Sequence, residues 1–405
     1  MKIALIAPTR IPARTANSLQ VMKMAQALVQ SGHAIRLAAP RIASEDSAGT
    51  PGWQELSRQY GLSESFPIDW LPAATWGRGY DYALRSLFWA RGWGAEFCYT
   101  RLPQAAALAS LTGFHTIFEV HDLPSGRWGP TVYRAFLRGR GARRLVVITQ
   151  ALAKDLAVRL GAPLSPPLTL IAPDGVDLER FRDLPEPALA RQDLLSAGLL
   201  GPGQLPAGRF TAGYTGHLYP GRGTGLLLDM AACLPQVTFL VVGGEPQAVA
   251  QLRAQAQDRQ LTNLLATGFV PNQDLPRYQA ACDVLLMPYQ DRVAASSGGD
   301  ISRYLSPMKV FEYLACGRPI LSSDLPVLRE VLDERNAIML PPDQVEAWAQ
   351  ALRDLQTHPQ YRELLGEQAR QTARRYSWQA RAERILEGLQ PGTVLERSHA
   401  DAHID

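Results

Sequence analysis

The first half of the chain alternates short, continuously apolar runs with longer segments whose apolar residues recur at helical spacing. Residues 2–7 form such a run, residues 18–31 carry apolar side chains every three or four positions, and residues 34–39 are apolar again. A short apolar run without alternation is typical of a strand that is buried on both faces. The order strand, helix, strand therefore predicts a doubly wound parallel α/β sheet. Further strands of this kind are expected at residues 116–120, 145–148 and 168–172.

The same pattern begins again after a stretch that is rich in proline. Prolines stand at positions 185, 187, 202 and 206, which predicts an irregular linker at residues 186–208. New apolar strands are expected at residues 209–214, 237–244, 264–270 and 283–288. We therefore predict two Rossmann-like α/β domains, residues 1–185 and 209–376. A last amphipathic helix is expected at residues 377–390, followed by a polar tail at 392–405.

Length, composition and charge narrow the class of protein. The chain has 405 residues, of which 46% are hydrophobic and 20% charged, as in an ordinary globular protein of two or more domains. A net charge of +3 is too small to indicate a nucleic-acid partner. No run of about eighteen apolar residues is present, and the first apolar run is too short for a signal peptide. We expect a cytoplasmic protein.

The cysteines suggest neither disulfides nor a metal site. They are widely scattered, with no C-x-x-C pair and no spacing typical of metal ligands, at Cys98, Cys233, Cys282 and Cys316. Each lies among apolar or small residues, so we expect four buried, reduced thiols. No metal ligand set is predicted.

One segment of the second half reads as a helix with both ends marked. Ser306 is a suitable N-cap, Pro307 suits the first helical position, and Gly317 suits the end. The start of a helix offers free N–H groups and a positive dipole end, a natural seat for phosphate. Lys309 and Glu312 share a face near that seat, which suits a nucleotide diphosphate whose ribose binds the carboxylate. A solvated ion pair on an exposed helix is the alternative interpretation.

Two further loops carry candidate chemistry. A glycine-rich turn at residues 215–223 includes Gly216, His217 and Arg222, and can bring main-chain N–H groups and a guanidinium to a phosphate. His121 and Asp122 follow an apolar strand, at the sheet edge where parallel sheets bind ligands, and could position or deprotonate an acceptor hydroxyl. The loop at residues 9–17 contains no glycine, so the G-x-G-x-x-G fingerprint of dinucleotide enzymes is absent.

Arginines gather in three places in the first half. Residues 75–93 mix arginine with tryptophan, tyrosine and phenylalanine, and residues 127–144 hold six arginines and no acid. Both segments could lie on a membrane surface or line an acceptor groove, and solvated or core helices remain the alternative. Arg10 and Arg14, in the loop after the first strand, could meet an acidic acceptor or lie in solvent.

The helix described above also resembles a known sequence. The run SPMKVFEYLACGRPILSSDLPVLREVL, residues 306–332, closely resembles the donor-binding segment of family 4 (group 1) glycosyltransferases. The strings EVHDLP, PDGVDLERF and YSWQARAERIL resemble other segments of that family, in the family's order, and the likeness is strongest over residues 211–377. The resemblance implies the GT-B fold: two Rossmann-like domains facing across a cleft, with the last helix crossing back to the N-terminal domain.

The resemblance also assigns roles to residues. The N-terminal domain would bind the acceptor and the C-terminal domain the donor. Glu312 would bind the ribose, and Val270 would lie near the base. The diphosphate would be held by Lys309, Arg222 and the main-chain N–H groups after Ser306, near Met308. His121 would lie beside the transferred sugar. The family usually has a second glutamate eight residues before Glu312, where this chain has Tyr304, and His217 stands where an arginine is often found.

We therefore expect a metal-independent, retaining glycosyltransferase, of the hexosyltransferase class, that uses a UDP- or GDP-type sugar donor and needs no cofactor. Its product could belong to glycan, polysaccharide or glycolipid synthesis. The acceptor would carry a hydroxyl group and could be lipid-linked, with the protein peripheral at the inner face of the cell membrane. Two alternatives remain: a nucleotide-sugar epimerase of the same fold, and a sugar-nucleotide-binding protein without catalysis.

Overall fold

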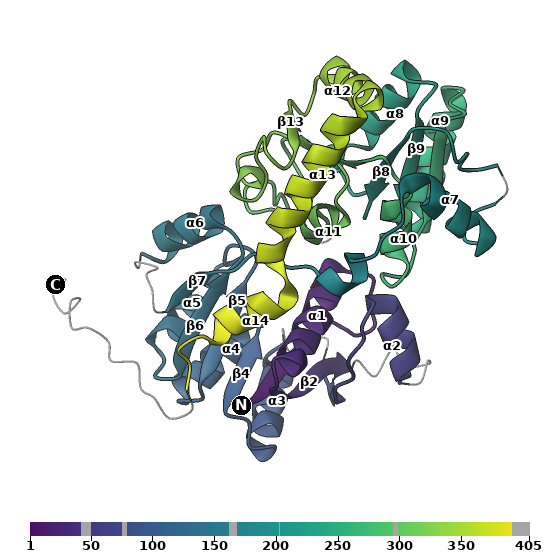
Figure 1. The fold of residues 1–405 in the computed structure, drawn as a ribbon. Helices are drawn as coiled ribbons and strands as arrows, with labels where there is room; N and C mark the ends of the chain where they lie inside the picture. The colour runs from purple at the N-terminus through teal and green to yellow at the C-terminus, as the bar shows by residue number, and fades with distance from the viewer. Residues whose placement is uncertain (42–49, 75–78, 162–167, 202, 295–298, 391–405) are drawn as a thin grey trace.

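The computed structural model describes residues 1–41, 50–74, 79–161, 168–201, 203–294 and 299–390. Its strands form two separate sheets, each with helices on both faces (Figure 1). Trp76 and Arg78 of the aromatic segment, the serines of the loop at 295–298 and the tail at 392–405 lie outside the described residues. The prediction of two doubly wound α/β domains is confirmed.

The first sheet has the strand order β3-β2-β1-β4-β5-β6-β7, and every pair is parallel. Its strands are β1 (Lys2–Ile6), β2 (Ala34–Arg41), β3 (Ile68–Pro72), β4 (Phe97–Thr100), β5 (Thr116–Val120), β6 (Ala142–Val147) and β7 (Thr169–Ile171). The helices that cover it are α1 (Ala16–Gln30), α2 (Trp53–Tyr60), α3 (Tyr80–Gly92), α4 (Pro103–Leu111), α5 (Gly129–Arg138) and α6 (Gln150–Leu160). Central strands such as β4 and β5 are buried along their whole length, which explains their unbroken apolar sequences.

The second sheet has the order β10-β9-β8-β11-β12-β13, again parallel throughout. Its strands are β8 (Thr211–Thr215), β9 (Thr238–Val242), β10 (Leu264–Gly268), β11 (Val284–Met287), β12 (Ile320–Ser323) and β13 (Ile338–Leu340). Its helices are α8 (Thr224–Cys233), α9 (Pro246–Asp258), α10 (Leu275–Ala280), α11 (Met308–Cys316), α12 (Val345–Thr357) and α13 (Pro359–Ala373). The chain reverses its winding between β1 and β4 in the first sheet and between β8 and β11 in the second. Ligands bind at such switch points, beyond the carboxyl ends of the strands.

The chain returns to the first domain at its end. Helix α14 (Trp378–Leu386) follows α13 and lies beside α1, far from the sheet that precedes it in the sequence (Figure 1). Trp378, Ile385 and Leu386 are buried in the same apolar core as Ile3 and Met24. The apolar face of this helix therefore belongs to the first domain, as the family pattern predicts.

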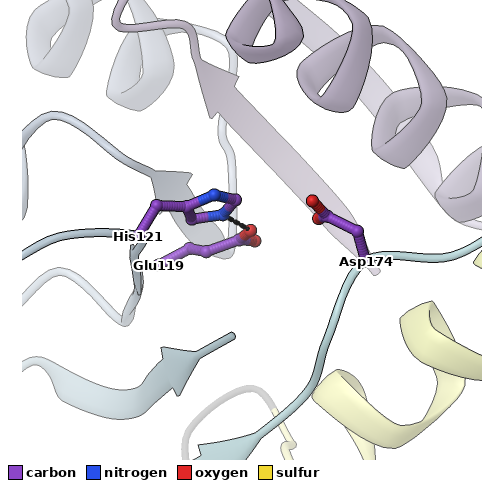
Figure 2. A group of neighbouring side chains, drawn as sticks. All are labelled: Glu119, His121 and Asp174. Atoms are coloured by element: carbon purple, nitrogen blue, oxygen red, sulfur yellow. Dashed lines mark hydrogen bonds and ion pairs between the residues drawn. The ribbon is translucent and has the colours of Figure 1, made fainter. Parts of the chain in front are cut away.

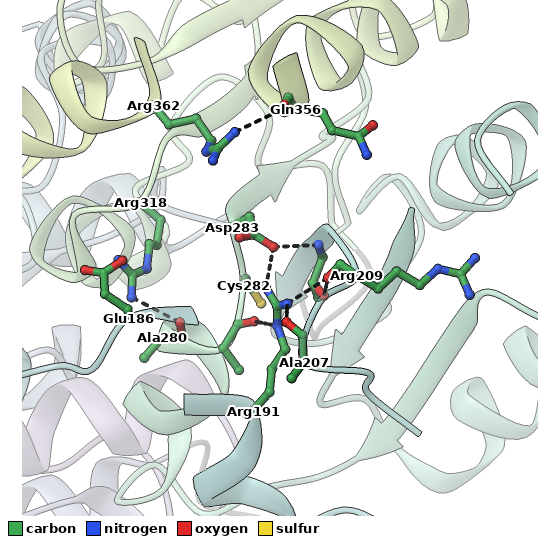
Figure 3. Close-up of polar contacts among 12 residues, drawn as sticks. Glu186, Arg191, Ala207, Arg209, Ala280, Cys282, Asp283, Arg318, Gln356 and Arg362 are labelled. Atoms are coloured by element: carbon green, nitrogen blue, oxygen red, sulfur yellow. Dashed lines mark hydrogen bonds and ion pairs between the residues drawn. The ribbon is translucent and has the colours of Figure 1, made fainter. Parts of the chain in front are cut away.

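The segment that we expected to be an irregular linker contains a helix, α7 (Pro187–Ser196). Ala190 and Leu194, four residues apart, are buried in the core of the second domain. Arg191 is buried beside them, where its guanidinium pairs with Asp283 and donates to the carbonyl of Ala207 at 2.6 Å (Figure 3). The prolines begin and flank this helix rather than preventing it, and α7 is fixed to the second domain.

Two smaller expectations are also wrong. Strand β6 begins at Ala142, three residues earlier than expected, so that Arg143 and Arg144 lie in the sheet and are buried. These two arginines cannot belong to a basic helical face. Cys233 is exposed at the end of α8, whereas the other three cysteines are buried as expected.

Candidate active site

A cleft of about 470 Å³ lies between the two domains, at the switch points of both sheets. Its walls include the loop after β1, the loop after β5, the glycine-rich turn after β8 and the start of α11. The predicted catalytic and donor-site residues all line this cleft: His121, Asp122, Gly216, His217, Arg222, Val270, Ser306, Met308, Lys309 and Glu312. Of the two loop arginines suggested for the acceptor, Arg14 lines it and Arg10 does not. The two domains therefore bring the predicted residues together.

The start of α11 forms part of the wall contributed by the second domain. The helix begins at Met308, one residue later than expected, with Pro307 as its N-cap and no side chain capping its N–H groups. The prediction that Ser306 caps the helix is therefore wrong. The uncapped first turn still faces the cleft, since Ser306, Pro307 and Met308 all line it. Its free N–H groups suit an anion. Gly317 ends the helix in the left-handed conformation, with φ of 67°, as predicted.

Two cationic nitrogens of this wall lack hydrogen-bond partners among the described residues. Among the described residues, nothing accepts a hydrogen bond from Nζ of Lys309 or from Nε of Arg222, although both atoms are buried. The Lys309 ammonium lies 3.8 Å from the centre of the Tyr214 ring, and the Arg222 guanidinium 5.0 Å from the centre of the Tyr289 ring. Burial, reinforced by the charge of Arg222, lowers the pKa of Lys309 well below 10.5. An anion in the cleft would relieve this penalty.

The glycine-rich turn allows the Lys309 side chain to lie against the main chain. Gly216 has φ of 134°, and a Cβ atom there would stand 2.8 Å from Nζ of Lys309. Gly223 packs so closely on the next loop that a Cβ atom would stand 1.8 Å from the Pro288 carbonyl oxygen. His217, in the same turn, stacks on Tyr219 with ring centres 4.8 Å apart, and its Nδ1 has no partner within the described chain.

Glu312 lies one turn further along α11, on the face of Lys309. Its carboxylate accepts hydrogen bonds from the side-chain amides of Gln279 at 3.1 Å and Asn272 at 3.4 Å. These bonds hold the carboxylate at the cleft wall and leave acceptor capacity for a ligand hydroxyl. Val270, past the end of β10, lines the same wall beside Phe269, over whose ring the Arg14 guanidinium lies at 4.1 Å. Arg14 therefore contacts the second domain across the cleft.

The first domain contributes His121, directly after β5. Its Nε2 lies 2.5 Å from Oε1 of Glu119, whose side chain is fully buried, while the His121 side chain keeps 19% of its surface exposed (Figure 2). Burial, reinforced by the Arg101 guanidinium, lowers the pKa of His121. A neutral imidazole that donates from Nε2 to Glu119 leaves Nδ1 as an acceptor.

Glu119 is the centre of a buried network. Arg381 of α14 donates to both of its oxygens, at 2.9 and 3.3 Å, and Gln20 of α1 donates at 2.7 Å. The Tyr99 hydroxyl donates to it as well. Burial would raise the pKa of Glu119, but the charge of Arg381 and the His121 hydrogen bond outweigh that effect and hold the pKa below its usual range. The returning helix thus completes the support behind His121.

Asp174 faces this pair from the segment after β7 (Figure 2). It is buried, its Oδ1 has no hydrogen-bond partner among the described residues, and burial raises its pKa. Ligand atoms of Glu119, His121 and Asp174 lie within 4.8 Å of one another, the only such group in the described parts of the chain. The guanidinium of Arg381 already neutralises Glu119, which makes the group a poor site for a cation.

Three residues of this group were missed by the sequence analysis: Glu119, Asp174 and Arg381. Glu119 stands two positions before His121 on a strand, and residues two apart share a face, so the pairing could have been expected. Nothing local marks Arg381 as part of the site, because its contacts with Glu119 span 262 positions. Asp122, which we expected beside His121 in function, is exposed, and its carboxylate accepts from the Leu123 N–H at 2.7 Å.

Tyr304 occupies the position where the resembled family has its first glutamate. Its ring packs in the core of the first domain with Phe118 and Tyr133, although Tyr304 belongs to the second domain. Its hydroxyl donates to Asp155 of α6 at 2.7 Å. Burial and this hydrogen bond raise the pKa of Tyr304 to about 12. The residue therefore joins the two domains at the edge of the cleft.

Residues 209–358 match the family model described as "Glycosyl transferases group 1". This segment is therefore similar to the group 1 glycosyltransferases. A protein of Saccharomonospora viridis named D-inositol 3-phosphate glycosyltransferase is 28% identical over 264 residues, which cover 61% of this chain and 55% of that protein. The chain spans about half the length of the curated relatives it matches.

Solved glycosyltransferase structures share the whole two-domain arrangement. Sucrose-phosphate synthase from Thermosynechococcus elongatus matches with a TM-score of 0.69 and 19% identity, over 94% of this chain and 96% of that one. Anabaena HepE in complex with UDP-glucose matches with a TM-score of 0.69 and 17% identity, over 96% of this chain and 98% of that one. The chain thus has the GT-B fold. None of the helices in its described part combines the length and apolar character needed to cross a bilayer.

Proposed function

We propose that this protein transfers a hexose from a nucleotide-diphosphate sugar to a hydroxyl group of an acceptor. The observation that carries the proposal is a pair of buried cationic nitrogens without hydrogen-bond partners among the described residues, Nζ of Lys309 and Nε of Arg222. They lie on one wall of a cleft whose other wall presents His121. A leaving diphosphate needs cations and N–H groups that are already in place when its charge develops. The first turn of α11 and these two side chains supply them.

The donor would lie along the second domain. Its diphosphate would contact Lys309, Arg222 and the N–H groups at the start of α11, and its ribose hydroxyls would donate to Glu312. The base would lie near Val270. The solved complexes of HepE with UDP and UDP-glucose support a UDP sugar, and a GDP sugar is the alternative to be tested. The proposal includes no metal or other cofactor, because side chains of the protein neutralise the diphosphate.

The acceptor hydroxyl would approach from the first domain. His121, held by Glu119, offers an unprotonated Nδ1 that can accept the hydroxyl's hydrogen bond and orient its oxygen toward the donor sugar. The transfer is proposed to retain the anomeric configuration of the sugar, on the strength of the family resemblance. Proton NMR of the first product formed, before any mutarotation, measures that configuration directly.

Nucleotide binding tests the donor site first. Wild-type protein, Glu312→Ala and the surface control Glu363→Ala would be melted with saturating UDP, GDP, ADP and NAD. Ligand at one hundred times its dissociation constant stabilises a protein by about 2.7 kcal/mol. We expect one nucleoside diphosphate to stabilise the wild type and Glu363→Ala but not Glu312→Ala. Stabilisation by NAD alone, or by no diphosphate, would contradict the proposal.

Turnover then separates the proposal from its alternatives. The donor that matches the selected nucleotide is incubated with and without a mixture of sugar and sugar-phosphate acceptors, and free nucleoside diphosphate is measured. A glycosyltransferase releases it much faster with acceptor, whereas an epimerase isomerises the donor without acceptor. Binding without any turnover would identify a sugar-nucleotide-binding protein instead.

A further inference from the structure

A second hollow, of about 600 Å³, opens beside the cleft on the side of the first domain. We call it the arginine groove, because four arginines line it: Arg127, Arg134, Arg159 and Arg303. They come from four places: the loop before α5, helix α5, helix α6 and the loop before α11. Tyr304 lines both the groove and the cleft, so the two hollows adjoin at that residue.

The groove carries more positive charge than its acids can neutralise. Asp155 is the one carboxylate among its lining residues, and it is already bonded to the Tyr304 hydroxyl and to Arg303 at 2.9 Å. Arg134 donates only to main-chain carbonyls, those of Leu160 at 3.0 Å and Arg159 at 3.2 Å, which hold its guanidinium in place but leave its charge. In the described part of the chain, no carboxylate pairs with Arg127, Arg134 or Arg159.

We infer that the arginine groove binds a phosphate or diphosphate group carried by the acceptor. This inference rests on the proposed function and specifies its acceptor. Guanidinium forks match phosphate oxygens in bidentate geometry, and four in one hollow with a single, already bonded carboxylate favour an anion of more than one charge. Leu123, two residues after His121, lines the groove, whereas the cations that we propose for the donor diphosphate lie on the opposite wall of the cleft. An acceptor with its hydroxyl at His121 would therefore place its phosphate past Tyr304.

The phosphate could belong to a soluble phosphorylated sugar or to a lipid headgroup. Exposed apolar residues beside the groove could contact a sugar or a lipid. Val158, which lines the groove, is 84% exposed, and Trp128, next to Arg127, is 63% exposed. The binding chemistry is the same in both cases, and the experiment has a separate arm for each.

The test uses inorganic diphosphate as the probe and removes the donor site from the measurement. In a Lys309→Met, Arg222→Gln background, diphosphate binding is measured by titration calorimetry. We expect binding to persist in this background and to weaken about tenfold or more when Arg127→Gln and Arg159→Gln are added, because two charge-assisted contacts are lost. Arg138→Gln with Arg140→Gln, two exposed arginines of the same segment outside the groove lining, is the matched control and should change the affinity less than twofold.

The outcomes separate this inference from the proposed function. No diphosphate binding in the background protein, or equal weakening by both arginine pairs, overturns the inference whatever the nucleotide experiments show. If the wild type binds no nucleoside diphosphate, the proposed function is overturned, but the diphosphate affinities measured for the arginine groove still stand. The source is then identified by flotation with vesicles of phosphatidylcholine, with and without phosphatidylglycerol. Flotation that depends on Arg127 and Arg159 indicates a lipid headgroup, and diphosphate binding without flotation indicates a soluble phosphorylated acceptor.

Discussion

The two walls of the cleft differ in how their polar groups are satisfied. On the first domain, the Glu119 carboxylate accepts from Arg381, Gln20 and Tyr99 and lies beside His121. On the second domain, buried nitrogens of Lys309 and Arg222 have no hydrogen-bond partner within the described chain. The Glu119 network of the first wall is complete without a ligand, whereas the second wall is not.

This difference indicates what each wall does. A fully bonded network fixes a side chain in one position, which suits the orientation of an acceptor at His121. A buried cation without a partner is costly to the folded protein, and such a cost is retained where a ligand supplies the missing partner. The first wall should therefore respond to mutation mainly in stability, and the second mainly in ligand binding and turnover.

The largest effect is expected on the completed wall. Arg381→Met leaves the buried Glu119 carboxylate without its ion pair, which should destabilise the protein by about 3–5 kcal/mol. Urea denaturation measures the change. The double variant Glu119→Gln, Arg381→Met removes both charges and should recover more than half of the loss. A single-variant change below about 1 kcal/mol would show that the network does not hold the wall together.

On the incomplete wall, Lys309→Met should affect catalysis rather than folding. Removing a preorganised charge from a site where negative charge develops lowers kcat by about 100- to 1000-fold. The folded protein should be at least as stable as the wild type, since its pKa shift shows that the charged form of Lys309 is penalised by folding. Lys154→Met, an exposed lysine of α6, is the control. If Lys309→Met lowers stability but leaves kcat unchanged, the proposed difference between the two walls is wrong.

Asp174 is the exception on the first wall, and it sharpens the comparison. Its raised pKa means that folding penalises the ionised carboxylate, so the penalty is fully present at neutral pH and disappears as the pH falls below the ordinary Asp pKa of 3.8. Asp174→Asn should therefore stabilise the protein by about 1 kcal/mol at pH 7, and by little near pH 3. Thermal melts at the two pH values check this sign. An unchanged melting temperature at pH 7 would mean that Oδ1 has an ordered partner.

The smallest expected effect is the uptake of protons when a diphosphate binds. The pKa of Lys309 is lowered in the free protein by burial and Arg222, and a bound diphosphate should raise it again. Binding then takes up protons at alkaline pH, and affinity falls as the pH rises above the pKa of the free protein. Calorimetry at about pH 8.5, in buffers of different ionisation enthalpy, measures this uptake. Lys309→Met should abolish it, and equal uptake in wild type and variant would assign the proton to another group.

The sequence was most informative where a function is carried by neighbouring residues. Lys309 and Glu312 lie within four positions, and the glycine-rich turn holds Gly216 and Arg222 together, so local pattern and resemblance predict the donor wall. The doubly wound parallel α/β class of both domains also follows from the alternation of apolar runs and helices. The capping residue of α11 was misplaced by one position, because Ser306 and Pro307 can each occupy that place.

What could not be predicted depends on contacts that are distant in sequence. The Arg381–Glu119 ion pair exists only because α14 returns to the first domain. Helix α7 was hidden by its prolines, and its order depends on the burial of Arg191 against Asp283. The position of Tyr304 could not be predicted for the same reason, because its ring packs against residues of the other domain.

The most direct test of this account compares a nucleoside diphosphate with its nucleoside. Calorimetry would measure the affinities of wild type and Lys309→Met for UDP and uridine, or for the base selected by the melting experiment. If Lys309 and Arg222 bind the diphosphate, the wild type should bind UDP about 100-fold or more tightly than uridine. Lys309→Met should reduce that preference by about tenfold. Equal affinity for UDP and uridine, or an unchanged preference in Lys309→Met, would contradict the account.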